Sequence, residues 1–158
     1  MLRSILLYIE MVAKHDSLQA SKHLSSLRFC VSSSETLHPS LAQKFYQLFN
    51  SKNHTLLNYY GSTEGMADAL FHIVTEAESQ KEKIPLGVAL NNTSVYILDK
   101  KFQPVPAGQV GEIYTSGLNT ASGYVNGREP HRFMDNPFTT DPGKQKINIK
   151  KFKMFSSV

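Results

Sequence analysis

The stretch that decides the fold is Thr55–Gly65, which reads TLLNYYGSTEG. Its first six residues have the pattern of a strand, and Gly61-Ser62-Thr63-Glu64-Gly65 then supplies turn residues. A glycine turn that carries two hydroxyl groups and a carboxylate directly after a strand can hold an anion together with a divalent cation. The same residues also fit an ordinary strand–turn–helix in which Ser62 or Thr63 caps the helix.

The residues before this stretch alternate between helix and strand patterns. Apolar side chains at helical spacing predict a helix over residues 2–13, and the polar residues 16–24 predict a second short helix. Residues 27–31 form an apolar run of strand length. Residues 38–49 predict another helix, because a proline stands where its first turn begins. The order helix, strand, helix, strand predicts an α/β layer with a parallel sheet.

The second half of the chain has strand patterns separated by loops. The expected elements are a strand over residues 67–75, a charged loop over 76–83, strands over 94–98 and 110–115 joined by a turn over 99–108, and a short helix over 129–134. We therefore expect a small β-hairpin or barrel portion after the parallel layer.

Composition and charge restrict the function classes. The chain has 158 residues, of which 41% are hydrophobic, and this suits one globular domain. Its net charge of +4 suggests a nucleic-acid partner, but five of the 17 Lys and Arg residues lie in residues 144–158, which contain no acid. The remainder has 12 basic and 13 acidic residues, so we expect no nucleic-acid partner. We interpret residues 144–158 as an unrelated, disordered basic tail.

Cysteine use and hydropathy point to a reducing compartment without a membrane anchor. Cys30 is the only cysteine, so neither an internal disulfide nor a cysteine-rich zinc site can form. No apolar run reaches the roughly 20 residues of a membrane span. We expect a cytoplasmic protein that does not contact membranes.

Four segments together resemble the adenylate-forming (AMP-forming) synthetase superfamily, which includes acyl-CoA synthetases and nonribosomal peptide synthetase adenylation domains. Tyr60–Glu64 is similar to the family's Tyr-Gly-x-Thr-Glu motif, and Pro106–Ile113 to its Pro-x-Gly-x-x-Gly-Glu-Ile pattern. Ser116–Tyr124 with Arg132-Phe133 resembles the Gly-x-Gly-Tyr and Arg-Phe segment that follows, and Pro85–Gly87 the Pro-x-Gly that precedes. Within the superfamily, the nonribosomal adenylation domains of β-alanyl amine synthetases look most similar.

The resemblance covers residues 1–143 and implies a partial AMP-binding domain, taken from the large N-terminal domain of such an enzyme. It implies that a carboxylate attacks the α-phosphate of ATP, giving an acyl adenylate and pyrophosphate. A carrier thiol or another nucleophile then takes the acyl group. The acid would be β-alanine or another amino acid, and the phosphopantetheine carrier would lie on the parent protein rather than in this chain.

The resemblance also implies roles for particular residues. Thr63 and Glu64 would be catalytic, with Thr63 on the α-phosphate and Glu64 as the ligand of Mg²⁺. Asp68 would pair with the amine of β-alanine, although a solvated carboxylate explains it equally well. The implied nucleotide-binding residues are Ser34, Asn58, Tyr60, Gly61, Ser62 and Thr63, with Asn58 and Tyr60 on the adenine. The implied substrate pocket comprises Val31, Ser33, Tyr59, Ala67 and Asp68.

The chain departs from the family pattern in several places. The family usually has glycine where Ser34 stands, because backbone and ligand pass closely there. The glycine-rich phosphate loop, the Tyr-x-Thr-Gly-Asp ribose motif and the C-terminal catalytic lysine are missing from these 158 residues. We expect a fragment that is inactive alone and exposes apolar faces. Two alternatives stay open: a non-catalytic form with weak nucleotide or partner binding, and a fragment of a fatty-acyl or aryl-CoA synthetase.

Overall fold

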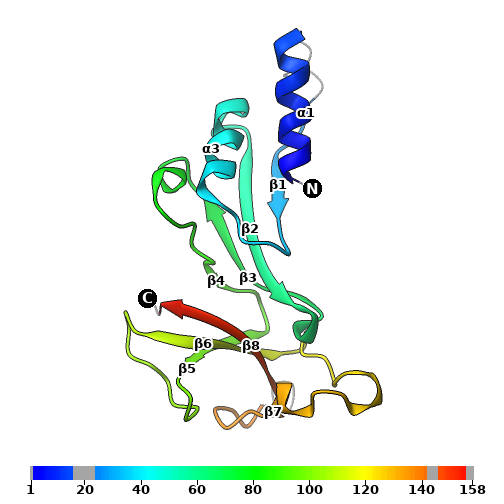
Figure 1. The fold of residues 1–158 in the computed structure, drawn as a ribbon, viewed down its shortest axis with the longest axis vertical. Coiled ribbons are helices and arrows are strands. Elements are labelled where there is room, and N and C mark those ends of the chain that lie inside the picture. The colour runs from blue at the N-terminus through cyan, green and yellow to red at the C-terminus, as the bar shows by residue number, and fades with distance from the viewer. Residues whose placement is uncertain (1, 16–23, 142–145, 156–158) are drawn as a thin grey trace. The chain divides into compact units, whose positions relative to one another are not determined.

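The computed structural model describes residues 2–15, 24–141 and 146–155 (Figure 1). The chain folds as two compact units. The first contains residues 1–60 and 71–88, and the second contains residues 61–70 and 89–158. The predicted helix over residues 16–24 lies, except for Leu24, outside the described residues. Among the described residues, no helix is long and apolar enough to cross a membrane.

A four-stranded sheet of order β1-β2-β3-β4 begins in the first unit. Strand β1, Phe29–Ser32, pairs in parallel with β2, Thr55–Ser62, so that Phe29 faces Thr55 and Ser32 faces Asn58. The other strands are β3, Ala67–Val74, and β4, Val88–Ala89. The helix α3, Pro39–Leu48, connects β1 to β2, as parallel pairing requires. This βαβ arrangement confirms the predicted α/β class.

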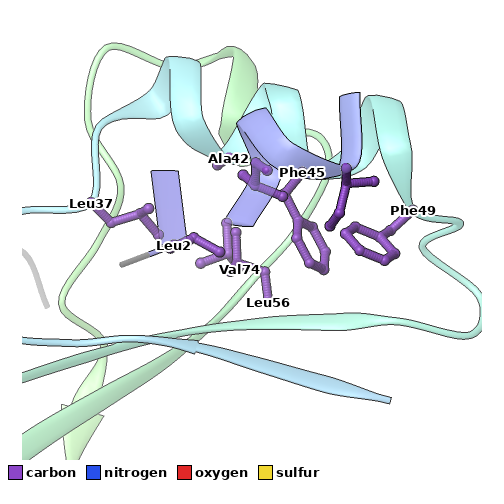
Figure 2. Packing of buried hydrophobic residues seen from close by; sticks show 9 residues of the cluster. Leu2, Leu37, Ala42, Phe45, Phe49, Leu56 and Val74 are labelled. Carbon is purple, nitrogen blue, oxygen red and sulfur yellow. The ribbon is translucent and has the colours of Figure 1, made fainter. Parts of the chain in front are cut away.

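In the core of the first unit, two amphipathic helices pack against strands β2 and β3. Leu2, Leu6 and Ile9 of α1, Leu2–His15, are buried at helical spacing. Helix α3 begins at Pro39, where the His38 side chain accepts a hydrogen bond from the Ser40 amide at 3.3 Å. Figure 2 shows helical side chains directed at the strands, and the buried cluster comprises Leu2, Leu6, Ile9, Leu37, Ala42, Phe45, Phe49, Leu56 and Val74.

One side of the first unit's strands exposes apolar side chains. Phe29, Val31 and Ile73 keep 56%, 49% and 55% of their surface exposed. Because side chains alternate along a strand, Phe29 and Val31 share one face of β1. The expected exposure of apolar faces is therefore present at these strands.

The second unit contains an antiparallel sheet of order β5-β6-β8-β7. The predicted hairpin is confirmed as β5, Thr93–Leu98, paired with β6, Val110–Gly117. A buried hydrophobic cluster of this sheet comprises Leu98, Tyr114 and Ile147. Short 3-10 turns connect other parts of the chain: η1, Thr63–Gly65; η2, Glu78–Gln80; η3, Val125–Gly127; and η4, Pro130–Arg132.

Two sequence expectations differ from the structure of this unit. The helix expected over residues 129–134 is only the turn η4, followed by strand β7, Phe133–Asp135. Glu129 has φ of 46°, outside the right-handed helical region, and it precedes Pro130, which disfavours helix at the residue before it. Phe133 is extended and pairs with Asn148.

The tail is the second difference. In place of a disordered segment, the structure has strand β8, Lys146–Phe155, between β6 and β7. Ile147 and Ile149 alternate with Lys146, Asn148 and Lys150, which is the period of a strand with one apolar face. Ile147 is fully buried. The lysine content concealed this alternation, because five lysines without an acid dominate the composition of residues 144–158.

Candidate functional site

The first group of predicted site residues lies at the carboxyl ends of β1 and β2. Because the two strands are parallel and Ser32 is the partner of Asn58, Ser33 and Ser34 leave β1 at the level where Tyr59 and Tyr60 continue β2. In α/β sheets, ligands bind outside the carboxyl ends of parallel strands. Topology alone thus brings together the first-unit residues Val31, Ser33, Ser34, Asn58, Tyr59 and Tyr60.

Asn58 is buried, with 2% of its surface exposed. Its Nδ2 donates a hydrogen bond to the carbonyl oxygen of Pro85 at 2.9 Å. The bond ties β2 to the Pro85–Gly87 segment, so the side chain has a structural role in addition to the nucleotide contact predicted for it. Tyr59, next along β2, packs its ring 6.0 Å from that of Phe71.

Ser34 has φ of 74°, in the left-handed region that non-glycine residues rarely occupy. The family pattern has glycine at this position, and the resemblance attributes that glycine to the close passage of a ligand. The structure supplies a second reason, because the backbone of this turn itself favours glycine. Serine therefore introduces backbone strain at the edge of the candidate site.

The second group of predicted residues forms the turn between β2 and β3. Ser62 caps η1, and its hydroxyl oxygen accepts a hydrogen bond from the Gly65 amide at 3.2 Å. Ser62 is thus a cap, as the alternative expected, but η1 is a three-residue 3-10 turn that leads into β3 and not a helix. The side chain of Thr63 is exposed. A Cβ atom added to Gly61 would lie 1.7 Å from the carbonyl oxygen of Ala67. The backbone of Ala67 by itself therefore requires glycine there.

Glu64 is the acidic residue of this turn, and it is buried, with 7% of its surface exposed. The Tyr124 hydroxyl donates a short hydrogen bond to Glu64 Oε1, and Arg132 Nη1 lies 3.6 Å from the same oxygen. The backbone carbonyl of Glu64 accepts a hydrogen bond from the Ala121 amide at 2.8 Å. The loop that follows β6 therefore holds both the backbone and the carboxylate of Glu64.

The environment of Glu64 favours its charged form. Burial by itself raises the pKa of the carboxyl group, but hydrogen bonds from Tyr124, the Glu64 amide and Ser62, with the Arg132 charge, outweigh burial and lower it. Conversely, the hydrogen bond to Glu64 raises the pKa of Tyr124. At neutral pH, Glu64 is a carboxylate and Tyr124 a phenol, so the donor and acceptor roles are defined.

Tyr124 and Arg132 also line a pocket of about 250 Å³, together with Arg128 and Glu129. None of these four was assigned a role from the sequence. Tyr124 and Arg132 do stand in segments that resemble the family, but they are 60 and 68 residues from Glu64. No local spacing connects positions so far apart, and only the fold brings them together.

Ala67 and Asp68 begin β3, directly after the turn. Ala67 is exposed and Asp68 half-buried. The backbone carbonyl of Asp68 accepts a hydrogen bond from Asn119 Nδ2 at 3.2 Å, which ties β3 to the segment after β6. Within the second unit, the structure thus assembles the Gly61–Asp68 turn, Asn119, Tyr124 and Arg132.

Among the described residues, no three His, Cys, Asp or Glu side chains gather as a metal centre would require. Mg²⁺ commonly uses only one or two carboxylates and takes its other ligands from substrate phosphates and water. A single ionised Glu64 in a glycine turn fits that mode of binding. It does not fit a metal held by protein ligands alone.

The sequence of residues 5–125 matches the family described as AMP-binding enzyme. The chain belongs to this family. Over 146 residues it is 42% identical to the β-alanyl-bioamine nonribosomal peptide synthetase ebony of Drosophila melanogaster. That match covers 89% of this chain and 16% of ebony, so the chain spans less than a fifth of this relative. The resemblance to nonribosomal peptide synthetases is confirmed.

Solved structures agree with this assignment. The N-terminal subdomain of Klebsiella oxytoca NpsA, in complex with 3-hydroxybenzoyl-AMSN, superposes with a TM-score of 0.70 at 20% identity, over 82% of this chain and 32% of that one. The four-domain nonribosomal peptide synthetase AB3403, bound to AMP and glycine, gives a TM-score of 0.64 at 27% identity, over 80% of this chain and 9% of that one. The fold is that of part of an adenylation domain.

Proposed function

We propose that the protein containing this chain activates an amino acid by forming an acyl adenylate from ATP, and that the acid is β-alanine. The observation that carries the proposal is Glu64, a buried, ionised carboxylate that directly follows the Gly61–Thr63 turn. The membership of the AMP-binding family and the likeness to ebony and AB3403 support it.

In this proposal the turn between β2 and β3 handles the phosphates. The exposed Thr63 hydroxyl binds the α-phosphate, and Glu64 ligates Mg²⁺. When bound, Mg²⁺ would neutralise negative charge on the phosphate oxygens. Asn58 and Tyr60 contact the adenine, while Ser34, Gly61 and Ser62 lie along the nucleotide. Such a reaction depends on positioned donors more than on covalent chemistry. This suits a turn whose Glu64 and Asp68 carbonyls accept hydrogen bonds from the segment after β6.

The proposed substrate pocket comprises Val31, Ser33, Tyr59, Ala67 and Asp68. Asp68 supplies the charge for an amino acid substrate, because its carboxylate can pair with a protonated amine. The name of ebony associates that relative with β-alanyl products, and AB3403 binds glycine, so two similar proteins handle small amino acids. A phosphopantetheine carrier elsewhere in the parent protein would accept the acyl group, and the protein would act in the cytoplasm.

The test is ATP–pyrophosphate exchange by the full natural protein across β-alanine, other amino acids, aryl acids and fatty acids. We expect Mg²⁺-dependent exchange that is fastest with β-alanine. Exchange with fatty or aryl acids alone would favour an acyl-CoA synthetase, and no exchange with any acid would refute adenylate formation.

Variants of Asp68 test the choice of β-alanine separately. Asp68→Asn should lower kcat/KM for β-alanine by about 10- to 100-fold, the usual worth of a charge-assisted hydrogen bond. Asp141→Asn, a change at an exposed carboxylate of the same unit, is the control and should have no effect. Equal activity of Asp68→Asn and the wild type would exclude the amine contact but leave adenylate formation intact.

A further inference from the structure

Arg132 lies between two carboxylates of the second unit. Its Nε is 2.8 Å from Glu129 Oε2, and its Nη1 is 3.6 Å from Glu64 Oε1. The Glu64 side chain is 8% exposed and the Glu129 side chain 52% exposed. One guanidinium thus pairs with an enclosed carboxylate and with an open one.

The two contacts differ in kind. The contact with Glu129 has the length of a charge-assisted hydrogen bond, whereas the contact with Glu64 is too long for a hydrogen bond and is an ion pair only. Arg132 can therefore move away from Glu64 while it keeps its stronger partner. Tyr124 can stay on Glu64 Oε1 during such a movement, because its own hydroxyl makes that hydrogen bond without the guanidinium.

An enclosed carboxylate is costly unless hydrogen bonds and nearby positive charge compensate it. When no divalent cation is bound, hydrogen bonds compensate most of the charge of Glu64, and a positive neighbour adds to them. Arg132 supplies that charge. The same charge opposes a second cation that approaches the carboxylate, because like charges a few ångströms apart repel. A divalent cation and Arg132 are in this respect alternatives at Glu64.

We infer that Arg132 is a positioning residue that serves as the resident counter-ion of Glu64 and competes with the divalent cation for it, with Glu129 drawing Arg132 away. The inference rests on the proposed role of Glu64 as the ligand of Mg²⁺. It adds a regulation of that site: the balance between the two carboxylates sets how much Mg²⁺ the protein requires.

Two variants should shift the Mg²⁺ requirement in opposite directions. Arg132→Gln removes the competitor and should lower the Mg²⁺ concentration for half-maximal exchange about fivefold, the upper worth of a partly exposed ion pair. Glu129→Gln leaves Arg132 with Glu64 alone and should raise that concentration by about the same factor. In the Arg132→Gln background, Glu129→Gln should have no effect, because Glu129 acts through Arg132.

The same variants can be tested without turnover. Mn²⁺ is titrated into the full natural protein with α,β-methylene-ATP, and free Mn²⁺ is followed by electron paramagnetic resonance. We expect Arg132→Gln to bind Mn²⁺ more tightly than the wild type, and Glu129→Gln to bind it more weakly. Glu129 is half-exposed, so Glu129→Gln provides the test by itself where Arg132→Gln does not fold.

Arg128→Gln is the control for net charge. It removes the same charge from the same pocket, four residues earlier, and should shift the Mn²⁺ affinity less than about twofold. Equal shifts for Arg128→Gln and Arg132→Gln would overturn the inference, as would a Glu129→Gln effect that persists without Arg132. Absence of exchange by the wild type with every acid would instead refute the proposed function.

Discussion

Tyr124→Phe removes one hydroxyl group from the contact that holds Glu64. The Tyr124 ring packs edge-on against Phe133 with centroids 5.6 Å apart, and phenylalanine preserves this packing. The hydrogen bond to the ionised carboxylate is lost. Hydrogen bonds to charged groups contribute about 1.5–3 kcal/mol, and the partial exposure of Tyr124 places the expected loss at about 1–2 kcal/mol at neutral pH.

The loss should depend on pH with a defined sign. The pKa of Glu64 is lowered in the folded chain, so the contribution of this group to stability is present above its unfolded pKa and is lost as pH falls through the folded pKa. Tyr124 donates to the charged form. The difference between Tyr124→Phe and the wild type is therefore full at pH 7 and shrinks below the ordinary carboxyl range.

Hydrogen exchange measures this loss locally. Peptides that contain the Ala121 amide, which donates to the Glu64 carbonyl, should lose about 5- to 30-fold in protection at pH 7, corresponding to 1–2 kcal/mol. Tyr96→Phe is the control, because Tyr96 Oη accepts only a long bond of 3.4 Å from Asn136. Unchanged protection in Tyr124→Phe at pH 7, or a loss that grows as the pH falls, would refute the reasoning.

Three further substitutions test the backbone and the core. Ser34→Gly should stabilise the folded chain by about 0.5–1 kcal/mol, because relief of the positive φ exceeds the entropy cost of glycine; a lower midpoint of thermal unfolding would contradict this. Gly61→Ala should destabilise it by about 3 kcal/mol or more in urea unfolding, whereas Gly108→Ala, with open space around the new Cβ, should cost only about 1 kcal/mol. Phe45→Ala should cost about 3–5 kcal/mol by the same measurement, because Phe45 is fully buried; a loss below 1 kcal/mol would show that this core does not form.

The elements that sequence reasoning located correctly are those whose signal is local. The helix at Leu2–His15 and the helix at Pro39–Leu48 follow from apolar spacing and from a proline at the start of the second helix. Strand β2 and its turn follow from the pattern of residues 55–65. In each case, neighbouring residues carry enough information to select the backbone conformation.

The errors occurred where long-range pairing outweighs local composition. Strand β7 exists because Phe133–Asp135 pairs with β8, although residues 129–134 suggest a helix. Strand β8 exists because its backbone pairs with β6 and β7 on either side, although its lysines suggest disorder. Pairing of this kind joins segments many residues apart, so no window of sequence contains it.

The candidate site divides in the same way. The sequence by itself determined the family and the glycine turn with Thr63 and Glu64, because these residues adjoin and their chemistry is evident from their order. Only the tertiary structure placed Tyr124 and Arg132 on the Glu64 carboxylate. It also showed that Gly61 is required by the Ala67 backbone and that Ser34 occupies a left-handed conformation. Contacts and backbone angles of this kind arise from how distant segments pack, and the identity of neighbouring residues does not determine them.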